Sequence, residues 1–251
     1  MERFDFYGVQ FSAVNMQSVL DFMDSYDFNS PGYISFPDSS VVALASKNDE
    51  LARILNNAIL TLPDGKPSQI AARRQGYTNV STVSGYWLCQ QLLSSSKFSH
   101  YFLGSTPNKL QLIQAKIEAD YPKARVLGYR SPEFLSVDTF QNGYILRDEM
   151  DEINVLKPDL IWIGLSSPKQ DYLVNSHVHV LKKGLFLGVG GVFDYLSGEV
   201  AKSPEWVKKI GLRWLWRLCS EPKRLGPKYW NTIKFFISSA YNRKDTKKKQ
   251  V

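Results

Sequence analysis

Short hydrophobic runs alternate along this chain with segments in which hydrophobic residues recur every three or four positions. The runs have the length of buried strands and cover residues 59–63, 98–103, 124–128, 160–163 and 185–189. The periodic segments predict amphipathic helices, most clearly over residues 41–58 and 108–121. This alternation predicts an α/β fold, with a Rossmann-like, largely parallel sheet flanked by helices.

Small and polar residues follow four of the predicted strands. These strand ends are Asp64 with Gly65, residues 104–106, residues 164–170 and residues 188–194. Ligands of parallel α/β sheets bind outside the carboxyl ends of the strands, so we expect a functional site at these four segments.

Gly104, Ser105 and Thr106 stand where a predicted strand gives way to a helix. Backbone N–H groups without helical partners and the positive end of the helix dipole could bind a phosphate there. The same residues before Pro107 are also typical of an ordinary helix start. The pattern alone leaves both interpretations open.

A second glycine-rich segment contains Gly188, Gly190 and Gly191 and continues to Asp194. Glycines let a backbone approach a ligand closely, although a turn with positive φ would need them as well. The segment lacks the dinucleotide fingerprint, because Phe193 occupies the third glycine position and no suitable acidic residue follows. A nicotinamide-dependent dehydrogenase is therefore disfavoured.

Asp64 lies between Pro63 and Gly65, so an ordinary turn is one interpretation of this segment. Because it also lies at a strand end, beside the glycine-rich segments, its carboxylate could act as a general base. In that role it would take the proton from an attacking hydroxyl group.

The acidic and histidine residues do not have the spacing of a metal site. The acids at positions 148–152 are expected to open a helix, and His100, His177 and His179 lack the arrangement of metal ligands. We therefore expect no metal and no cofactor. The charge of a departing nucleotide diphosphate would then be stabilised by helix ends, backbone N–H groups and arginines.

Positive charge is concentrated in the last fifty residues. Residues 202–251 contain fourteen Lys or Arg and three acids, a net charge of +11, so residues 1–201 carry −4 of the total of +7. Such a segment suits an anionic membrane surface, and single-stranded nucleic acid is an alternative partner. A third interpretation is a helix that packs its aromatic side chains against the core. The aromatic residues are Trp206, Trp214, Trp216, Tyr229, Trp230, Phe235, Phe236 and Tyr241.

The rest of the composition limits the cellular location. Two cysteines are too few for a disulfide framework and indicate a reducing cytoplasm. The first residues do not resemble a signal peptide, and no apolar run reaches the roughly 18 residues that predict a membrane-spanning helix. Any membrane contact is therefore expected to be peripheral.

Several runs of residues carry a family resemblance. They are LPDG at 62–65, YFLGSTP at 101–107, PDLIWIGLSSPKQD at 158–171, GVGGVFDYLSG at 188–198, AKSPEW at 201–206, GLRWLWRL at 211–218 and EPKR at 221–224. Through these runs, which lie between about residues 33 and 229, the chain resembles the WecG/TagA/CpsF glycosyltransferases. The order of the last runs is highly specific to that family.

The resemblance implies an inverting, metal-independent enzyme that uses a UDP-sugar and a polyprenyl-diphosphate-linked sugar acceptor. By the family's pattern Asp64 is the general base, and Arg217 and Arg224 belong to an appendage that docks on the membrane and supplies arginines to the diphosphate. The remaining matched positions imply substrate-binding residues: Ser35, Gly65, Gly104, Ser105, Thr106, Gly164, Gln170, Gly188, Gly190, Gly191 and Asp194.

Two departures from the family pattern concern the sugar specificity. Relatives have a Thr-x-Asn motif near a strand end, whereas this chain has Ser35, Phe36 and Pro37, which keeps a hydroxyl group and loses an amide. Relatives also have an arginine and an aspartate after the general base, and residues 79–84 contain neither.

We therefore interpret residues 1–201 as a glycosyltransferase core and residues 202–251 as a basic, aromatic-rich helical appendage. The expected reaction transfers an N-acetylmannosamine-type sugar or a uronic acid during cell-surface polysaccharide synthesis, at the inner face of the cell membrane. Nucleic acid is not expected as a partner, and the sequence leaves open a homo-oligomer. The alternative function is a non-catalytic nucleotide-binding or nucleic-acid-binding module.

Overall fold

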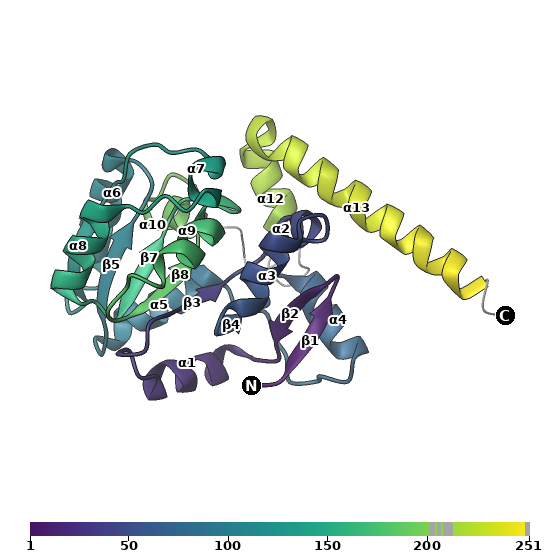
Figure 1. The fold of residues 1–251 in the computed structure, drawn as a ribbon, viewed down its shortest axis with the longest axis horizontal. Helices are drawn as coiled ribbons and strands as arrows, with labels where there is room; N and C mark the ends of the chain where they lie inside the picture. The colour runs from purple at the N-terminus through teal and green to yellow at the C-terminus, as the bar shows by residue number, and fades with distance from the viewer. Residues whose placement is uncertain (201–203, 205–206, 208–212, 249–251) are drawn as a thin grey trace.

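The fold is built on a parallel sheet of six strands, seen in a computed structural model that describes residues 1–200, 204, 207 and 213–248 (Figure 1). Side chains are described throughout these ranges except at residues 213, 224 and 240–248. The strand order is β4-β3-β8-β7-β5-β6, and every neighbouring pair is parallel. The predicted Rossmann-like α/β class is confirmed. The strands are β3 (Gly32–Ser35), β4 (Leu60–Thr61), β5 (Ser99–Leu103), β6 (Arg125–Arg130), β7 (Leu160–Ile163) and β8 (Leu185–Gly188).

All six strands end in one row. Ser35 pairs with Thr61 on one side and Gly188 on the other, and the pairing continues from Gly188 through Ile163 and Leu103 to Arg130. The chain leaves β5 toward β6 and leaves β7 in the opposite direction, toward β8. The carboxyl ends of the neighbouring strands β5 and β7 therefore flank a topological switch point, which is where α/β sheets bind their ligands. We use "this edge" for the row formed by the carboxyl ends of the strands.

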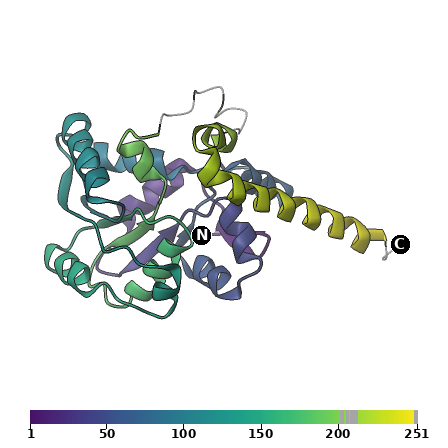
Figure 2. The same ribbon diagram turned by 90° about the horizontal axis from the view of Figure 1, so that it is seen from above.

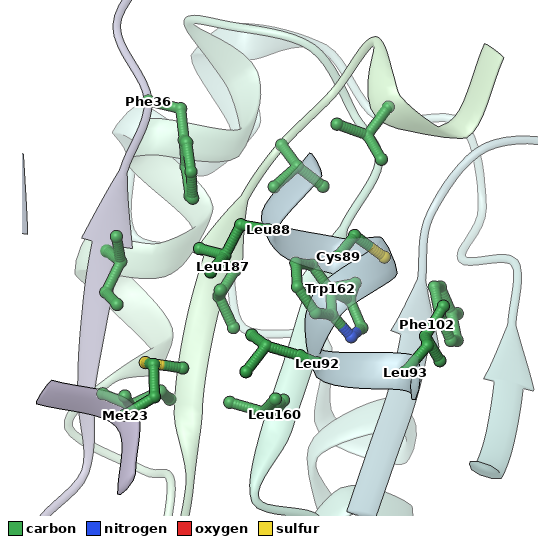
Figure 3. Packing of buried hydrophobic residues seen from close by; sticks show 14 of the residues in the cluster. Met23, Phe36, Leu88, Cys89, Leu92, Leu93, Phe102, Leu160, Trp162 and Leu187 are labelled. Carbon is green, nitrogen blue, oxygen red and sulfur yellow. The ribbon is translucent and has the colours of Figure 1, made fainter. Parts of the chain in front are cut away.

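Helices cover both faces of this sheet. One face packs against α1 (Met16–Ser25), α5 (Gly85–Ser95), α6 (Pro107–Asp120) and α10 (Val192–Leu196), and Figure 3 shows Trp162 and Leu187 within this core. The other face packs against α3 (Asp49–Asn57), α7 (Val137–Gln141), α8 (Arg147–Leu156) and α9 (Lys169–His177). Strands buried on both faces have continuous hydrophobic runs, which is why most of these strands could be predicted. The sequence analysis missed β3, because only Tyr33 and Ile34 form its hydrophobic run.

The N-terminal residues form a separate antiparallel hairpin, β1 (Arg3–Phe6) and β2 (Val9–Ser12), which the sequence analysis did not predict. It has its own hydrophobic cluster with α2 (Ser39–Ala45), α3 and α4 (Lys66–Arg74). The Arg3 guanidinium donates hydrogen bonds of 2.6 Å to the carbonyl groups of Asn56 and Ala58. These bonds tie the hairpin to the end of α3.

The single helix predicted over residues 41–58 is wrong, because the structure divides it into α2 and α3. Asn48 caps the second helix, since its side chain accepts a hydrogen bond of 2.9 Å from the N–H of Leu51. Asp38 caps the first in the same manner, by accepting from the N–H groups of Ser40 and Val41. Side-chain caps satisfy N–H groups that have no helical partner and so start a new helix.

Among the described residues, the C-terminal part of the chain contains the helices α12 (Arg213–Ser220) and the long α13 (Pro222–Lys248). Phe236 stacks on Phe6 of the hairpin with ring centroids 5.9 Å apart, and Lys228 forms an ion pair of 3.2 Å with Asp38. The far end of α13 extends away from the sheet (Figure 2). Within the described ranges, no helix is long and apolar enough to cross a membrane.

His177 and His100, two of the three histidines that lack metal-ligand spacing in the sequence, have structural contacts. His177 accepts a hydrogen bond of 2.9 Å from the N–H of Leu146, and His100 accepts one of 3.1 Å from the Trp162 indole. The described residues contain no group of three His, Cys, Asp or Glu side chains that could hold a metal ion. The acids at 148–152 do lie in the first half of α8, as predicted.

Candidate active site

The segments that follow β5 and β7 meet at the switch point. A Cβ atom at Gly104 would lie 3.0 Å from the backbone N and C atoms of Gly164, and Gly104 has a φ of +120°. A Cβ atom at Gly164 would lie 2.3 Å from the ring of Phe193, which follows β8. Three strand ends therefore converge here, at a separation that only glycine allows at positions 104 and 164.

The start of α6 has the geometry that the sequence suggested. Thr106 is the N-cap, and its side chain accepts a hydrogen bond of 3.3 Å from the N–H of Lys109. The segment after β6 supports this turn, because the Ser131 hydroxyl donates a 2.8 Å hydrogen bond to the carbonyl of Ser105. The helix start is confirmed, and its phosphate-binding role stays a prediction.

Gln170 links α9 to the glycine-rich segment after β8. Its Nε2 atom donates hydrogen bonds of 2.7 Å to the carbonyl of Gly188 and 3.2 Å to the hydroxyl of Ser167. A Cβ atom at Gly190 would lie 3.0 Å from its Oε1 atom, which is buried and has no hydrogen-bond partner among the described residues. Both amide hydrogens are used, so Oε1 remains as an acceptor at this edge.

Asp194 lies between two basic side chains. Its carboxylate is 2.6 Å from Lys109 Nζ and 2.8 Å from Arg217 Nη2. Arg217 also contacts the glycine-rich segment, because a Cβ atom at Gly191 would lie 2.5 Å from its Nη1 atom. Burial alone would lower the pKa of Arg217, but Tyr195, Asp194 and Glu221 raise it, so the guanidinium stays charged.

The end of β3 and the first turn of α9 contribute further buried polar groups. Ser35 is buried, and its hydroxyl has no hydrogen-bond partner in the described part of the chain. Asp171 is also buried, with one carboxylate oxygen unpartnered among the described residues. Burial, helped by the charge of Asp38, raises the pKa of Asp171 to about 6, against the opposing effects of Ser167 and Lys228.

Asp64 and Gly65 follow β4 and precede α4, at the same edge of the sheet. Gly65 has a φ of +141°, a conformation that favours glycine. Only β3 separates β4 from β8, so the ends of β4 and β8 lie about 10 Å apart. Asp64 lies in the segment that follows β4, and Gly190 lies in the segment that follows β8. The structure thus brings Asp64 to the edge where the glycine-rich segments lie.

Some predicted residues lie outside what the structure describes. The side chains of Arg224 and Tyr241 are among them, as is Trp206. The boundary between residues 201 and 202 also falls outside the described residues, so the division into core and appendage stays a prediction.

The sequence analysis missed four charged residues at this edge: Asp38, Lys109, Asp171 and Lys228. Asp171 lies at the end of one of the family-like runs, so it could have been singled out. Lys109 and Lys228 gave no signal, because their carboxylate partners lie 85 and 190 positions away in the sequence.

The fold defines a Rossmann-like α/β protein, and the switch point of its parallel sheet is the candidate ligand site. The sequence model of the glycosyl transferase WecG/TagA/CpsF family matches residues 4–250. The chain belongs to this family, and the glycosyltransferase activity expected from its motifs is confirmed at that level.

Relatives from several bacteria share one name. A Bacillus subtilis (strain 168) protein is 24% identical over 231 residues, which cover 89% of this chain and 86% of the relative. A Bacillus spizizenii (strain ATCC 23059 / NRRL B-14472 / W23) protein is 25% identical, with 82% of both chains covered. A Staphylococcus aureus (strain MW2) protein is 23% identical, with 89% and 87% covered. Each is named N-acetylglucosaminyldiphosphoundecaprenol N-acetyl-beta-D-mannosaminyltransferase.

Proposed function

We propose that this glycosyltransferase moves an N-acetylmannosamine-type sugar from UDP to a sugar on a polyprenyl diphosphate. The names of the relatives support this transferred sugar and this acceptor. UDP as the carrier is what the family resemblance implies, and a uronic acid is the second sugar that we consider. The observation that carries the proposal is the convergence of the segments after β5, β7 and β8 at the switch point, beside the helix start at Thr106.

In the proposed mechanism Asp64 accepts the proton of the acceptor hydroxyl. The hydroxyl oxygen attacks the anomeric carbon of the donor sugar, the bond to UDP breaks on the opposite side, and the configuration inverts. The Oε1 atom of Gln170 and the hydroxyl of Ser35 have no hydrogen-bond partner among the described residues, so both are available for hydrogen bonds to the sugar. UDP departs with its charge stabilised by the start of α6, by the backbone at Gly190 and by Arg217.

Replacing Asp64 by Asn tests this mechanism. We expect sugar transfer to an acceptor analogue to fall by at least about 100-fold, while the affinity for UDP changes little, because the base does not hold the nucleotide. Asp120→Asn, at the far end of α6, is the matched control. Near-normal turnover by Asp64→Asn would reject the assignment of the base.

We also propose that residues 202–251 dock this enzyme on an anionic membrane as a peripheral protein on its cytoplasmic side. Their net charge of +11 supports this role, and Trp230 and Ile237 are 59% and 66% exposed on α13. Exposed rings and aliphatic side chains among basic residues suit the headgroup region. These exposed residues do not fit the alternative in which the helix buries its apolar side chains, although Phe236 does pack on the hairpin.

Liposome sedimentation tests the membrane proposal. Binding to vesicles with anionic lipid should weaken in the double variant Trp230→Ser with Ile237→Ser, and it should stay unchanged in Val155→Ser. Val155 is exposed on α8, so that variant controls for loss of an apolar surface residue. Unchanged vesicle binding by the double variant, or tighter binding to single-stranded oligonucleotide than to vesicles, would contradict the proposal.

A further inference from the structure

The two carboxylate oxygens of Asp194 bind different basic residues. Oδ1 lies 2.6 Å from Lys109 Nζ, and Oδ2 lies 2.8 Å from Arg217 Nη2. Lys109 belongs to the first turn of α6, and Arg217 belongs to α12. Asp194 therefore connects the helix start at the switch point to the C-terminal part of the chain.

Lys109 is held more firmly than an ordinary surface lysine. Its side chain is 16% exposed, and Glu199 provides a second carboxylate at 2.8 Å. Burial alone would lower its pKa, but hydrogen bonds to Asp194 and Glu199 raise it, so the ammonium group stays charged. Because Lys109 lies three residues after the N-cap Thr106, its position is determined by the same helix start.

Arg217 retains hydrogen-bonding capacity after these contacts. Its Nη2 atom is shared between Asp194 and Glu221, at 2.8 and 3.3 Å. Its Nε atom is buried and has no hydrogen-bond partner among the described residues. A guanidinium group has five N–H donors, so Arg217 can still donate to an anionic oxygen beside Gly191.

We propose that Lys109 is a positioning residue, which acts through Asp194 to hold the Arg217 guanidinium against Gly191, where it receives the diphosphate of the nucleotide. The inference rests on the proposed function, since it assumes that a nucleotide diphosphate binds at this edge. Without Lys109, the Oδ1 atom of Asp194 loses its 2.6 Å ion pair, and the carboxylate is held less firmly against Arg217.

Three lysine variants test this role by their affinities for UDP and for uridine, which lacks the diphosphate. Lys109→Met removes the charge at similar length, and we expect on the order of 10-fold weaker UDP binding with unchanged uridine binding. Lys109→Arg keeps the charge and should restore most of the affinity. Lys116→Met is the matched control, because Lys116 lies on the same helix in a more exposed ion pair with Asp120.

A double-variant cycle separates positioning from direct contact. If Lys109 acts through Arg217, adding Lys109→Met to Arg217→Ala should weaken UDP binding by less than about twofold further. Losses that multiply would mean that Lys109 binds the diphosphate independently, which overturns the proposal, as would unchanged UDP affinity in Lys109→Met. Retained uridine binding shows that each variant is folded.

The same measurements distinguish this inference from the proposed function. A wild-type protein that binds UDP but transfers no sugar would refute the proposed reaction and leave the role of Lys109 to be decided by the cycle. A wild-type protein that does not bind UDP would refute both.

Discussion

The buried carboxyl group of Asp171 gives a prediction about stability in which both the sign and the size follow from its surroundings. Burial raises its pKa to about 6, and the nearby charge of Asp38 acts in the same direction. An unfolded chain has an aspartate pKa near 3.9, so the folded protein holds this proton more tightly. The contribution of Asp171 to wild-type stability therefore falls as the pH rises from about 4 to about 6, while its carboxyl group loses its proton.

Asp171→Asn removes this titration with little change in shape. A shift of about two pKa units corresponds to about 3 kcal/mol at 1.36 kcal/mol per unit. We expect the variant and the wild type to have nearly equal free energies of unfolding at pH 4. Above pH 6 the variant should be more stable than the wild type by about 3 kcal/mol. Urea denaturation at a series of pH values measures this difference.

Asp159 provides a control with the opposite sign. Burial would raise its pKa, but Lys183 at 2.8 Å and hydrogen bonds from Ser99 lower it overall. Its contribution to stability is present above the unfolded pKa and is lost as the pH falls, so Asp159→Asn should destabilise the protein at pH 7. The reasoning about Asp171 is refuted if Asp171→Asn is less stable than wild type at pH 7.5, or if the two variants change stability in the same direction.

Three further predictions concern the core and the thiols. Gly164→Ala should destabilise the protein by about 1–3 kcal/mol in urea denaturation, because its Cβ would lie 2.3 Å from the ring of Phe193; no loss would mean that the ring can move aside. Burial lowers the pKa of His177 to about 4, so its contribution to stability should fall by about 3 kcal/mol as the pH drops from 6.5 to 4, and the difference in free energy of unfolding between wild type and His177→Gln should change by that amount. Cys219 is exposed, whereas Cys89 is buried with a raised pKa, so a thiol reagent should label one cysteine in the native protein and two after unfolding.

Burial on both faces made β4, β5, β7 and β8 predictable from the sequence. The edge strand β6 is only partly buried, and β3, whose hydrophobic run consists of Tyr33 and Ile34 alone, was missed. In β7, Leu160 and Trp162 face one helical layer, and Ile161 and Ile163 face the other. Such a strand has no polar face, so the run is hydrophobic throughout and visible without an alignment.

The sequence of the N-terminal hairpin contains a weaker pattern, which extends over only a few residues on each side of a turn. Phe4, Phe6, Val9 and Phe11 alternate with polar residues on either side of Gly8, which is the pattern of a hairpin with one buried face. The division of residues 41–58 was also missed, since apolar periodicity continues across the break. The second helix starts directly after Asn48, because the side chain of this residue accepts a hydrogen bond from a backbone N–H group. In the sequence, Asn48 looks like an ordinary polar residue on the exposed face of a helix.

The sequence alone determined the fold class, the strand ends that form the site and the excess of positive charge in the C-terminal segment, because hydrophobic periodicity and charge are local properties of the chain. Only the tertiary structure decided which charged groups meet. Lys109, Asp194 and Arg217 come from three helices that the strand order brings to one edge. The side-chain oxygens of Gln170 and Asp171 that have no partner among the described residues, and the raised pKa of Asp171, likewise depend on what surrounds them in space. An ion pair or a buried acceptor is a property of distance and burial, and residue spacing along the chain specifies neither.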